Sequence, residues 1–87
     1  MKKLIKKHEP VEVTWVDINA DDSAWLPESD LQKHDVAQCK DVCYIYSQSK
    51  HKIITYSSYS YNVDGTIEFG GVCAFPRFCV KKIRKLS

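Results

Sequence analysis

Hydrophobic and polar residues alternate along much of the chain, and alternation at a period of two predicts β-strands. The clearest case is PVEVTWVDI, residues 10–18, in which Val11, Val13 and Trp15 share one face. Pro10 stands before them, where proline is tolerated at the start of a strand. The pattern therefore predicts a first strand with one face against the core.

Three further stretches carry strand signals. VAQCKDVCYIYS, residues 36–47, alternates apolar with polar residues, and KIITYSSYS, residues 52–60, is rich in tyrosine, threonine and isoleucine. Asp64-Gly65 is a strong hairpin signal before the next strand, IEFGGVCAF, residues 67–75. The glycine pair inside that strand, Gly70-Gly71, is typical of a sharp bend or bulge.

The end of the chain, CVKKIRKLS, fits two structures. Val80 and Ile83 follow helical spacing as well as they follow a bent strand. We favour a strand because the segment is short, carries β-branched residues and comes directly after the turn at Pro76. Its interleaved basic residues then face water and protect an edge strand from pairing with another chain.

No period holds in NADDSAWLPESDLQKHD, residues 19–35, between the first two strands. Its concentration of Asn, Asp, Ser and Pro predicts a long loop, with one helical turn after Pro27. Trp25 has two interpretations, a lid folded back over an open end of the core or an exposed anchor for a partner. Long loops in small domains often carry function.

Length and composition indicate one small soluble domain. A chain of 87 residues buries about 60–65% of its unfolded surface, so its core is small. We expect residues 1–9 to form a basic flexible N-terminal arm and residues 10–87 a single domain. No apolar run approaches the roughly 20 residues of a membrane span, and MKKLIKKHEP lacks the apolar stretch of a signal peptide. We therefore expect a cytoplasmic protein without membrane association, with its cysteines kept as thiols.

Five predicted strands, a long loop and a proline turn before the last strand form a familiar plan. GGVCAFPRFCVKKI, residues 70–83, resembles the closing segment of SH3-like barrels. There, strand four runs from a glycine into a proline-initiated turn, and strand five closes the sheet. The resemblance is best over residues 66–86. It implies a mostly β chain, a single small SH3-like antiparallel β-barrel of about five strands with one long loop.

The chain also resembles a group of small bacteriophage and prophage proteins. They have a VxWxD-type first strand, a long loop, a hairpin strand and a proline-containing ending. The matching residues here are Val13, Trp15, Asp17, Val42, Tyr44, Ile45, Pro76, Arg77, Val80, Ile83 and Leu86. Cys43 departs from the pattern, since glycine is usual there. The resemblance implies a phage or mobile-element origin and a host protein as partner, and it brings no activity with it.

The sequence carries no complete catalytic or metal-binding motif. Cys39-x3-Cys43 and Cys73-x5-Cys79 supply four thiols, but structural zinc sites favour tight C-x2-C loops. Buried cysteines more often act as small apolar residues. The three histidines lie in charged arm, loop or turn segments, and no nucleophile motif accompanies them. We therefore expect no enzymatic activity, no cofactor and no metal site.

Charge is distributed unevenly along the chain. Residues 1–8 hold four lysines and no acidic residue, whereas residues 9–35 hold eight acidic residues and one lysine. Residues 36–87 are basic again, with eight basic and three acidic residues. Such asymmetry indicates a charged partner but does not say which kind.

We expect a binding module that engages a host protein, as an inhibitor or an adaptor. Tyrosines offer large amphipathic contacts, and a loop tryptophan is a frequent interface anchor. The predicted contact residues are Asp21, Asp22, Trp25, Tyr56, Tyr59 and Tyr61. Self-association through an exposed edge strand is a further alternative.

A nucleic-acid-binding barrel is the alternative from another class. The same tyrosines would stack on bases, and the basic ending would bind phosphates. The predicted phosphate contacts are Lys81, Lys82, Arg84 and Lys85. Two features favour protein binding instead. The pI of about 8.3 lies below the strongly basic range of dedicated nucleic-acid binders, and the acidic loop repels phosphate.

Overall fold

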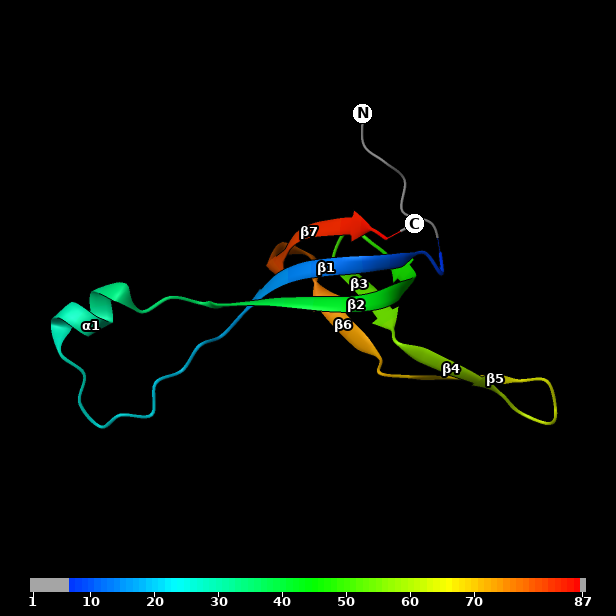
Figure 1. The fold of residues 1–87 in the computed structure, drawn as a ribbon, viewed down its shortest axis with the longest axis horizontal. Coiled ribbons are helices and arrows are strands. Elements are labelled where there is room, and N and C mark those ends of the chain that lie inside the picture. The colour runs from blue at the N-terminus through cyan, green and yellow to red at the C-terminus, as the bar shows by residue number, and fades with distance from the viewer. Residues whose placement is uncertain (1–6, 87) are drawn as a thin grey trace, which may run out of the picture.

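The computed structural model describes residues 7–86, which form two antiparallel β-sheets and two short helices (Figure 1). Most of the predicted basic N-terminal arm, residues 1–6, lies outside the described residues. The strands are β1 (Pro10–Asp17), β2 (Ala37–Gln48), β3 (Lys52–Tyr56), β4 (Ser58–Tyr61), β5 (Ile67–Gly70), β6 (Cys73–Pro76) and β7 (Val80–Lys85). The helices are α1 (Glu28–Lys33) and the 3-10 turn η1 (Arg77–Cys79).

The larger sheet has five strands in the order β6-β3-β2-β1-β7. Every neighbouring pair is antiparallel, so the last strand returns to lie beside the first. This confirms the coarser part of the fold prediction, a mostly β chain with a sheet of five antiparallel strands. Strands β6 and β7 are the two edges of this sheet, and no ladder joins them within residues 7–86.

Two of the predicted strands are each divided in the structure. The chain leaves the five-stranded sheet after Tyr56 and re-enters it at Cys73, and β4 and β5 form a separate hairpin in between. At the point where the hairpin leaves the five-stranded sheet, the Ser57 N–H donates a hydrogen bond to the Gly70 carbonyl oxygen, with 3.0 Å between nitrogen and oxygen. Gly71 has a φ of 65°, and a Cβ atom there would lie 1.9 Å from Ser57 Oγ. The bend predicted at the glycine pair is therefore confirmed, and glycine is required at its second position.

The core lies against one face of the five-stranded sheet. Successive side chains on a strand point to opposite faces, so Val11 and Val13 of β1 and Cys43 and Ile45 of β2, each pair two residues apart, are buried on one face. The buried cluster consists of Val11, Val13, Cys43, Ile45, Ile53 and Phe75. Trp15 packs against this cluster as predicted, and its indole Nε1 donates to Asp41 Oδ1 at 3.2 Å.

The segments around the prolines fold as short helical turns. Pro27 caps α1, which confirms the predicted helical turn in the long loop. Pro76 precedes η1, and the chain then enters β7, where Ile83 lies opposite Val13 of β1. The final segment is therefore a strand, as favoured. In the described part of the chain, no helix is long and apolar enough to cross a membrane.

Two projections extend from the sheet in opposite directions (Figure 1). One is the segment of residues 18–36 that carries α1, which we call the Trp25 loop, and the other is the β4–β5 hairpin. Because of them the radius of gyration is 17.2 Å, against about 12 Å for a compact chain of this length. Trp25 is 92% exposed. Its interpretation as a lid over the core is therefore wrong, because the loop carries it away from the sheet.

The burial pattern predicts how substitutions of Ile53 and Val42 affect stability. We expect Ile53→Ala to lower the free energy of unfolding by about 2–5 kcal/mol, because it leaves a cavity in the core. Val42, on the opposite face of the sheet, is 68% exposed. We therefore expect Val42→Ala to change the free energy of unfolding by less than about 0.5 kcal/mol. Urea denaturation measures both values. Ile53→Val, with a loss of about 0.5–1.5 kcal/mol, keeps the test measurable if the alanine variant does not fold. Equal losses at the two positions would contradict this placement of the core.

Candidate functional site

An aromatic groove of about 330 Å³ lies where the outer face of the sheet meets the β4–β5 hairpin. Tyr44 and Tyr56 reach it because they alternate with buried residues of β2 and β3 and so point away from the core. The hairpin supplies the opposite wall. The lining residues are His8, Tyr44, Tyr56, Tyr59, Tyr61, Ile67 and Phe69.

Tyr56 forms the floor of the aromatic groove. Its side chain is buried, and Tyr44, its cross-strand neighbour, stacks on it with ring centroids 5.4 Å apart and planes at 20°. Phe69 meets the Tyr56 ring edge-on at 4.7 Å, and Tyr59 does so at 6.3 Å. Such pairs contribute about 0.5–1.5 kcal/mol each beyond the burial of area. The cluster therefore holds the hairpin against the sheet and fixes the shape of the groove.

His8 closes one end of the groove. Its backbone N–H donates to the Ile45 carbonyl, and its ring Nδ1 lies 2.7 Å from the Tyr56 hydroxyl. Burial raises the pKa of the Tyr56 phenol above its ordinary value of 10.0, and the neighbouring Tyr59 and Tyr44 hydroxyls act in the same direction. The Tyr56 hydroxyl therefore stays protonated at neutral pH.

The wall formed by the hairpin is open to solvent. Tyr59 is 53% exposed and Tyr61 is 70% exposed, and their rings meet edge-on at 5.6 Å. Tyr46 meets Phe69 of the groove edge-on at 5.5 Å, and Lys7 Nζ lies 4.4 Å from the centroid of the Tyr46 ring, a cation–π contact. The groove thus combines a rigid buried floor with accessible aromatic rings.

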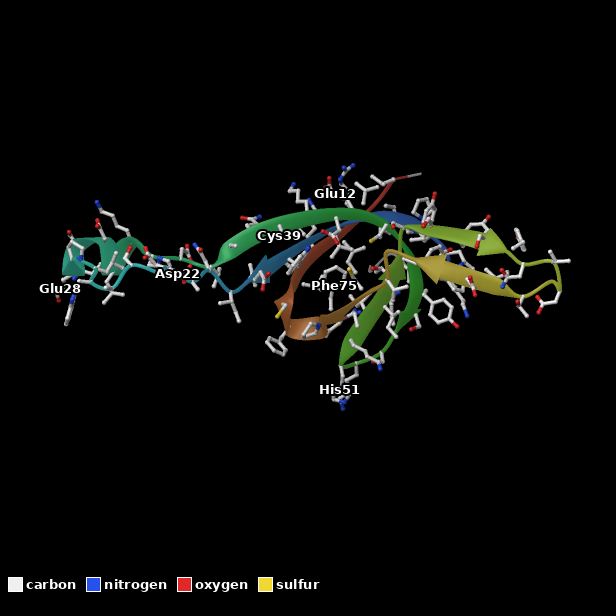
Figure 2. The ribbon with its side chains drawn as sticks, turned by 90° about the horizontal axis from the view of Figure 1, so that it is seen from below. Glu12, Asp22, Glu28, Cys39, His51 and Phe75 are labelled. Atoms are coloured by element: carbon white, nitrogen blue, oxygen red, sulfur yellow. The ribbon has the colours of Figure 1, made fainter. Side chains whose placement is uncertain are left out.

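The structure brings together only part of the predicted contact surface. Tyr56, Tyr59 and Tyr61 all line the aromatic groove. Asp21, Asp22 and Trp25 lie on the Trp25 loop, at the other end of the molecule, where Figure 2 labels Asp22. Asp21 accepts hydrogen bonds from Ser23, which lower the pKa of its carboxyl. The two halves of the predicted surface are therefore separate surfaces.

Sequence reasoning missed four residues of the groove. Tyr44 carried a usable signal, because its parity in β2 is opposite to that of the buried Cys43. Phe69 shares the parity of Phe75 along the sequence, but the break at Gly71 removes it from the core strand. Ile67 also carried a local signal, because the predicted turn at Asp64-Gly65 places it opposite Tyr61 in the hairpin. His8 carried none, since contacts with Ile45 and Tyr56, which are distant in sequence, bring it to the groove.

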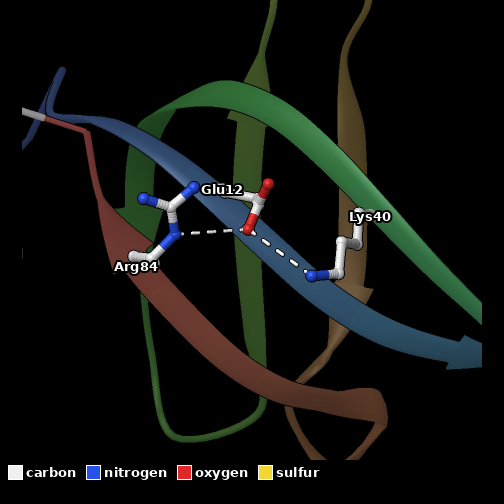
Figure 3. A network of polar contacts seen from close by, with 3 residues as sticks. All are labelled: Glu12, Lys40 and Arg84. Carbon is white, nitrogen blue, oxygen red and sulfur yellow. Dashed lines mark hydrogen bonds and ion pairs between the residues drawn. The ribbon is translucent and has the colours of Figure 1, made fainter.

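The predicted phosphate-binding residues lie on β7, at the far edge of the sheet from β3. Arg84 Nε is 3.3 Å from Glu12 Oε1, and Lys40 Nζ is 3.8 Å from the same oxygen (Figure 3). The hydrogen bond from Arg84 and the charges of Arg84 and Lys40 lower the pKa of the Glu12 carboxyl. Lys85 pairs with Glu9 at 3.7 Å. Lys81 and Lys82 are exposed. Two of the four predicted phosphate contacts are thus paired with carboxylates.

The four cysteines are free thiols. Burial raises the pKa of the Cys43 thiol above its ordinary value, and a hydrogen bond from Thr55 offsets part of this effect. Cys39, Cys73 and Cys79 are half-buried. Among the described residues, no three His, Cys, Asp or Glu side chains are grouped so that they could hold a metal ion.

Comparisons of the chain with protein-family models, with curated proteins and with solved structures found no match. The groove presents hydroxyls, one imidazole and aromatic faces, which are groups that recognise a ligand by contact area and hydrogen bonds.

The hydrogen bond between Tyr56 and His8 leads to a prediction on stability. We expect Tyr56→Phe to lower the free energy of unfolding by about 0.5–1.5 kcal/mol near neutral pH. The pKa of Tyr56 is higher in the folded protein than in the unfolded chain. The contribution of its hydroxyl to the free energy of unfolding is therefore complete below pH 10 and is lost as the pH rises through the folded pKa. Urea denaturation of both proteins at neutral and alkaline pH measures the difference. The control is Tyr61→Phe, at an exposed ring, which is expected to leave stability unchanged; an equal loss there would contradict the assignment.

The ion pairs of Glu12 lead to a second prediction, on pH. Since the pKa of Glu12 is lowered in the fold, its contribution to stability is present above pH 4.5 and is lost as the pH falls through the folded pKa. We expect Glu12→Gln to be less stable than the wild type at neutral pH and equally stable at about pH 2. Urea midpoints at both pH values test this, and salt of about 1 M should shrink the difference. If Glu12→Gln is still less stable than the wild type at about pH 2, the ion pairs of Glu12 do not stabilise the fold through charge.

Proposed function

We propose that the protein is a non-enzymatic binding module of SH3-like architecture that holds a segment of a partner protein in the aromatic groove. The sheet order, the return of β7 to β1 and the single turn η1 after Pro76 support this architecture. The β4–β5 hairpin then replaces the loop between the third and fourth strands of the larger sheet. The resemblance to phage and prophage proteins makes a host protein the proposed partner.

The exposed tyrosines above a fixed floor carry this proposal. Tyr59 and Tyr61 present large amphipathic rings that lose little conformational entropy on binding, and Phe69 and Tyr56 hold the hairpin in place. A groove that exists before the partner arrives lowers the ordering cost of association. Tyrosine hydroxyls along it supply donors and acceptors for a peptide backbone.

Binding of single-stranded nucleic acid is the second candidate, because its bases stack on aromatic side chains. Such binders also track the phosphates with a basic groove. Here the basic residues of β7 are separated from β3 by two strands, and Arg84 and Lys85 are paired with carboxylates. Lys7 is engaged with the Tyr46 ring. The charge arrangement therefore favours a protein partner.

The test is affinity capture with the tagged protein from bacterial lysate, with and without nuclease treatment. We expect a stoichiometric protein to be retained by the wild type and reduced at least ten-fold by the double variant Tyr59→Ser/Tyr61→Ser, because the exposed wall of the groove is lost. Val63→Ser is the matched control, since Val63 is a fully exposed apolar residue in the turn of the same hairpin. Circular dichroism establishes that the variants are folded.

Two outcomes would overturn the proposal. Equal capture by the double variant would place the contact outside the groove. Capture that disappears with nuclease would favour nucleic acid. In that case a labelled single-stranded oligonucleotide should bind with an affinity that falls steeply with salt and with Lys81→Glu/Lys82→Glu.

A further inference from the structure

A second hollow, of about 510 Å³ and mostly apolar, lies at the root of the Trp25 loop. It is bordered by the end of β1, by the edge strand β6 and by η1, and it shares no residue with the aromatic groove. Ile18 and Val36, the first and last residues of the loop, are exposed on its margin. Its apolar lining includes Trp15, Val16, Ile18, Val36, Cys73 and Phe75.

The Trp25 loop carries the apolar side chains that would fit such a hollow. Trp25 is almost fully exposed, and Leu31 of α1, in the same loop, is exposed as well. A tryptophan held in water on a projecting segment is typical of an interface anchor. The same chain therefore has an unfilled apolar hollow and an uncovered apolar anchor.

Charge indicates what brings the two together. The Trp25 loop is acidic, with Asp21, Asp22, Glu28, Asp30 and Asp35 against one lysine. The segment that follows β6 beside the hollow is basic, with Arg77 in η1 and Lys81 and Lys82 at the start of β7. Asp17 is the acidic residue in the lining of the hollow. A second copy of the chain thus offers both apolar and electrostatic complementarity to the loop.

We propose that two copies of the protein exchange their Trp25 loops, and that each Trp25 enters the apolar hollow of the other copy. The hollow lies at the root of the loop, and the exposed Trp25 belongs to the segment that projects from the sheet in Figure 1. Two loops that run antiparallel to each other therefore place each projecting end at the other's root. The same contact forms twice, so the assembly closes as a two-fold dimer.

Sedimentation equilibrium of the full chain tests this proposal. We expect the wild type to reach twice the mass of the 10.0 kDa chain as concentration rises. Trp25→Ala is expected to raise the dissociation constant at least ten-fold, because the anchor is lost. Val63→Ala, at an equally exposed residue of the other projection, should dimerise like the wild type. A monomer at all concentrations, or a dimer that Trp25→Ala leaves intact, would overturn the proposal.

A complementation experiment separates loop exchange from any other dimer. Ile18→Asp/Val36→Asp keeps the loop tryptophan and places two charges on the margin of the hollow, whereas Trp25→Ala keeps the hollow and lacks the anchor. Each variant alone is expected to be monomeric, and an equimolar mixture should form a heterodimer, weaker than the wild-type dimer, through the one remaining contact. A mixture that stays monomeric, while the wild type dimerises, would contradict the exchange.

The groove variant Tyr59→Ser/Tyr61→Ser is expected to dimerise like the wild type, because its substitutions lie outside the hollow. Failure of the dimer and failure of partner capture are therefore distinguishable.

Discussion

The pleat of the five-stranded sheet decides where every other feature of the molecule lies. The buried core cluster lies on one face of the sheet, and Val11, Val13 and Ile45 point to that side. Because side chains alternate, Tyr44 and Tyr56 must point to the opposite side. A one-residue slip of β2 would exchange the two sets, placing tyrosines in the core and thiols on the surface. The groove is thus a direct consequence of the register that forms the core.

A bare outer face would leave Tyr56 in water, and the hairpin prevents this. The chain bends at Gly71, which packs closely against Ser57, and the hairpin therefore leaves the sheet. As a result, Phe69 and Tyr59 of the hairpin lie against the Tyr56 ring. The hairpin is thereby held by aromatic contacts on a second small apolar cluster. The tyrosines beyond these contacts remain exposed, because the hairpin extends past the sheet (Figure 1).

The sequence predicted those elements that neighbouring residues determine. Alternation in β1, the turn at Asp64-Gly65 and the helical turn after Pro27 all follow from local chemistry. The groove could be predicted only in part, since pairing between β2 and β3 sets Tyr44 beside Tyr56, and ring contacts of Phe69 and Tyr59 bring the hairpin against them. The position of Trp25 could not be predicted from the residues next to it in the sequence either. An acidic, proline-containing loop can fold back or project, and only contacts with distant segments decide between the two.

The two surfaces of the molecule are compatible because they share no residue and involve different projections. The hollow lies at the root of the Trp25 loop, and the aromatic groove lies against the β4–β5 hairpin, which projects in the opposite direction from that loop (Figure 1). In the proposed dimer the loops would meet at the centre, so both hairpins would be carried outward and both grooves would stay accessible. Such an arrangement makes the dimer bivalent. A partner that is itself oligomeric then meets the second groove at a raised effective concentration, which increases overall affinity without any new contact. Modest affinity in each small groove would therefore suffice for a stable complex.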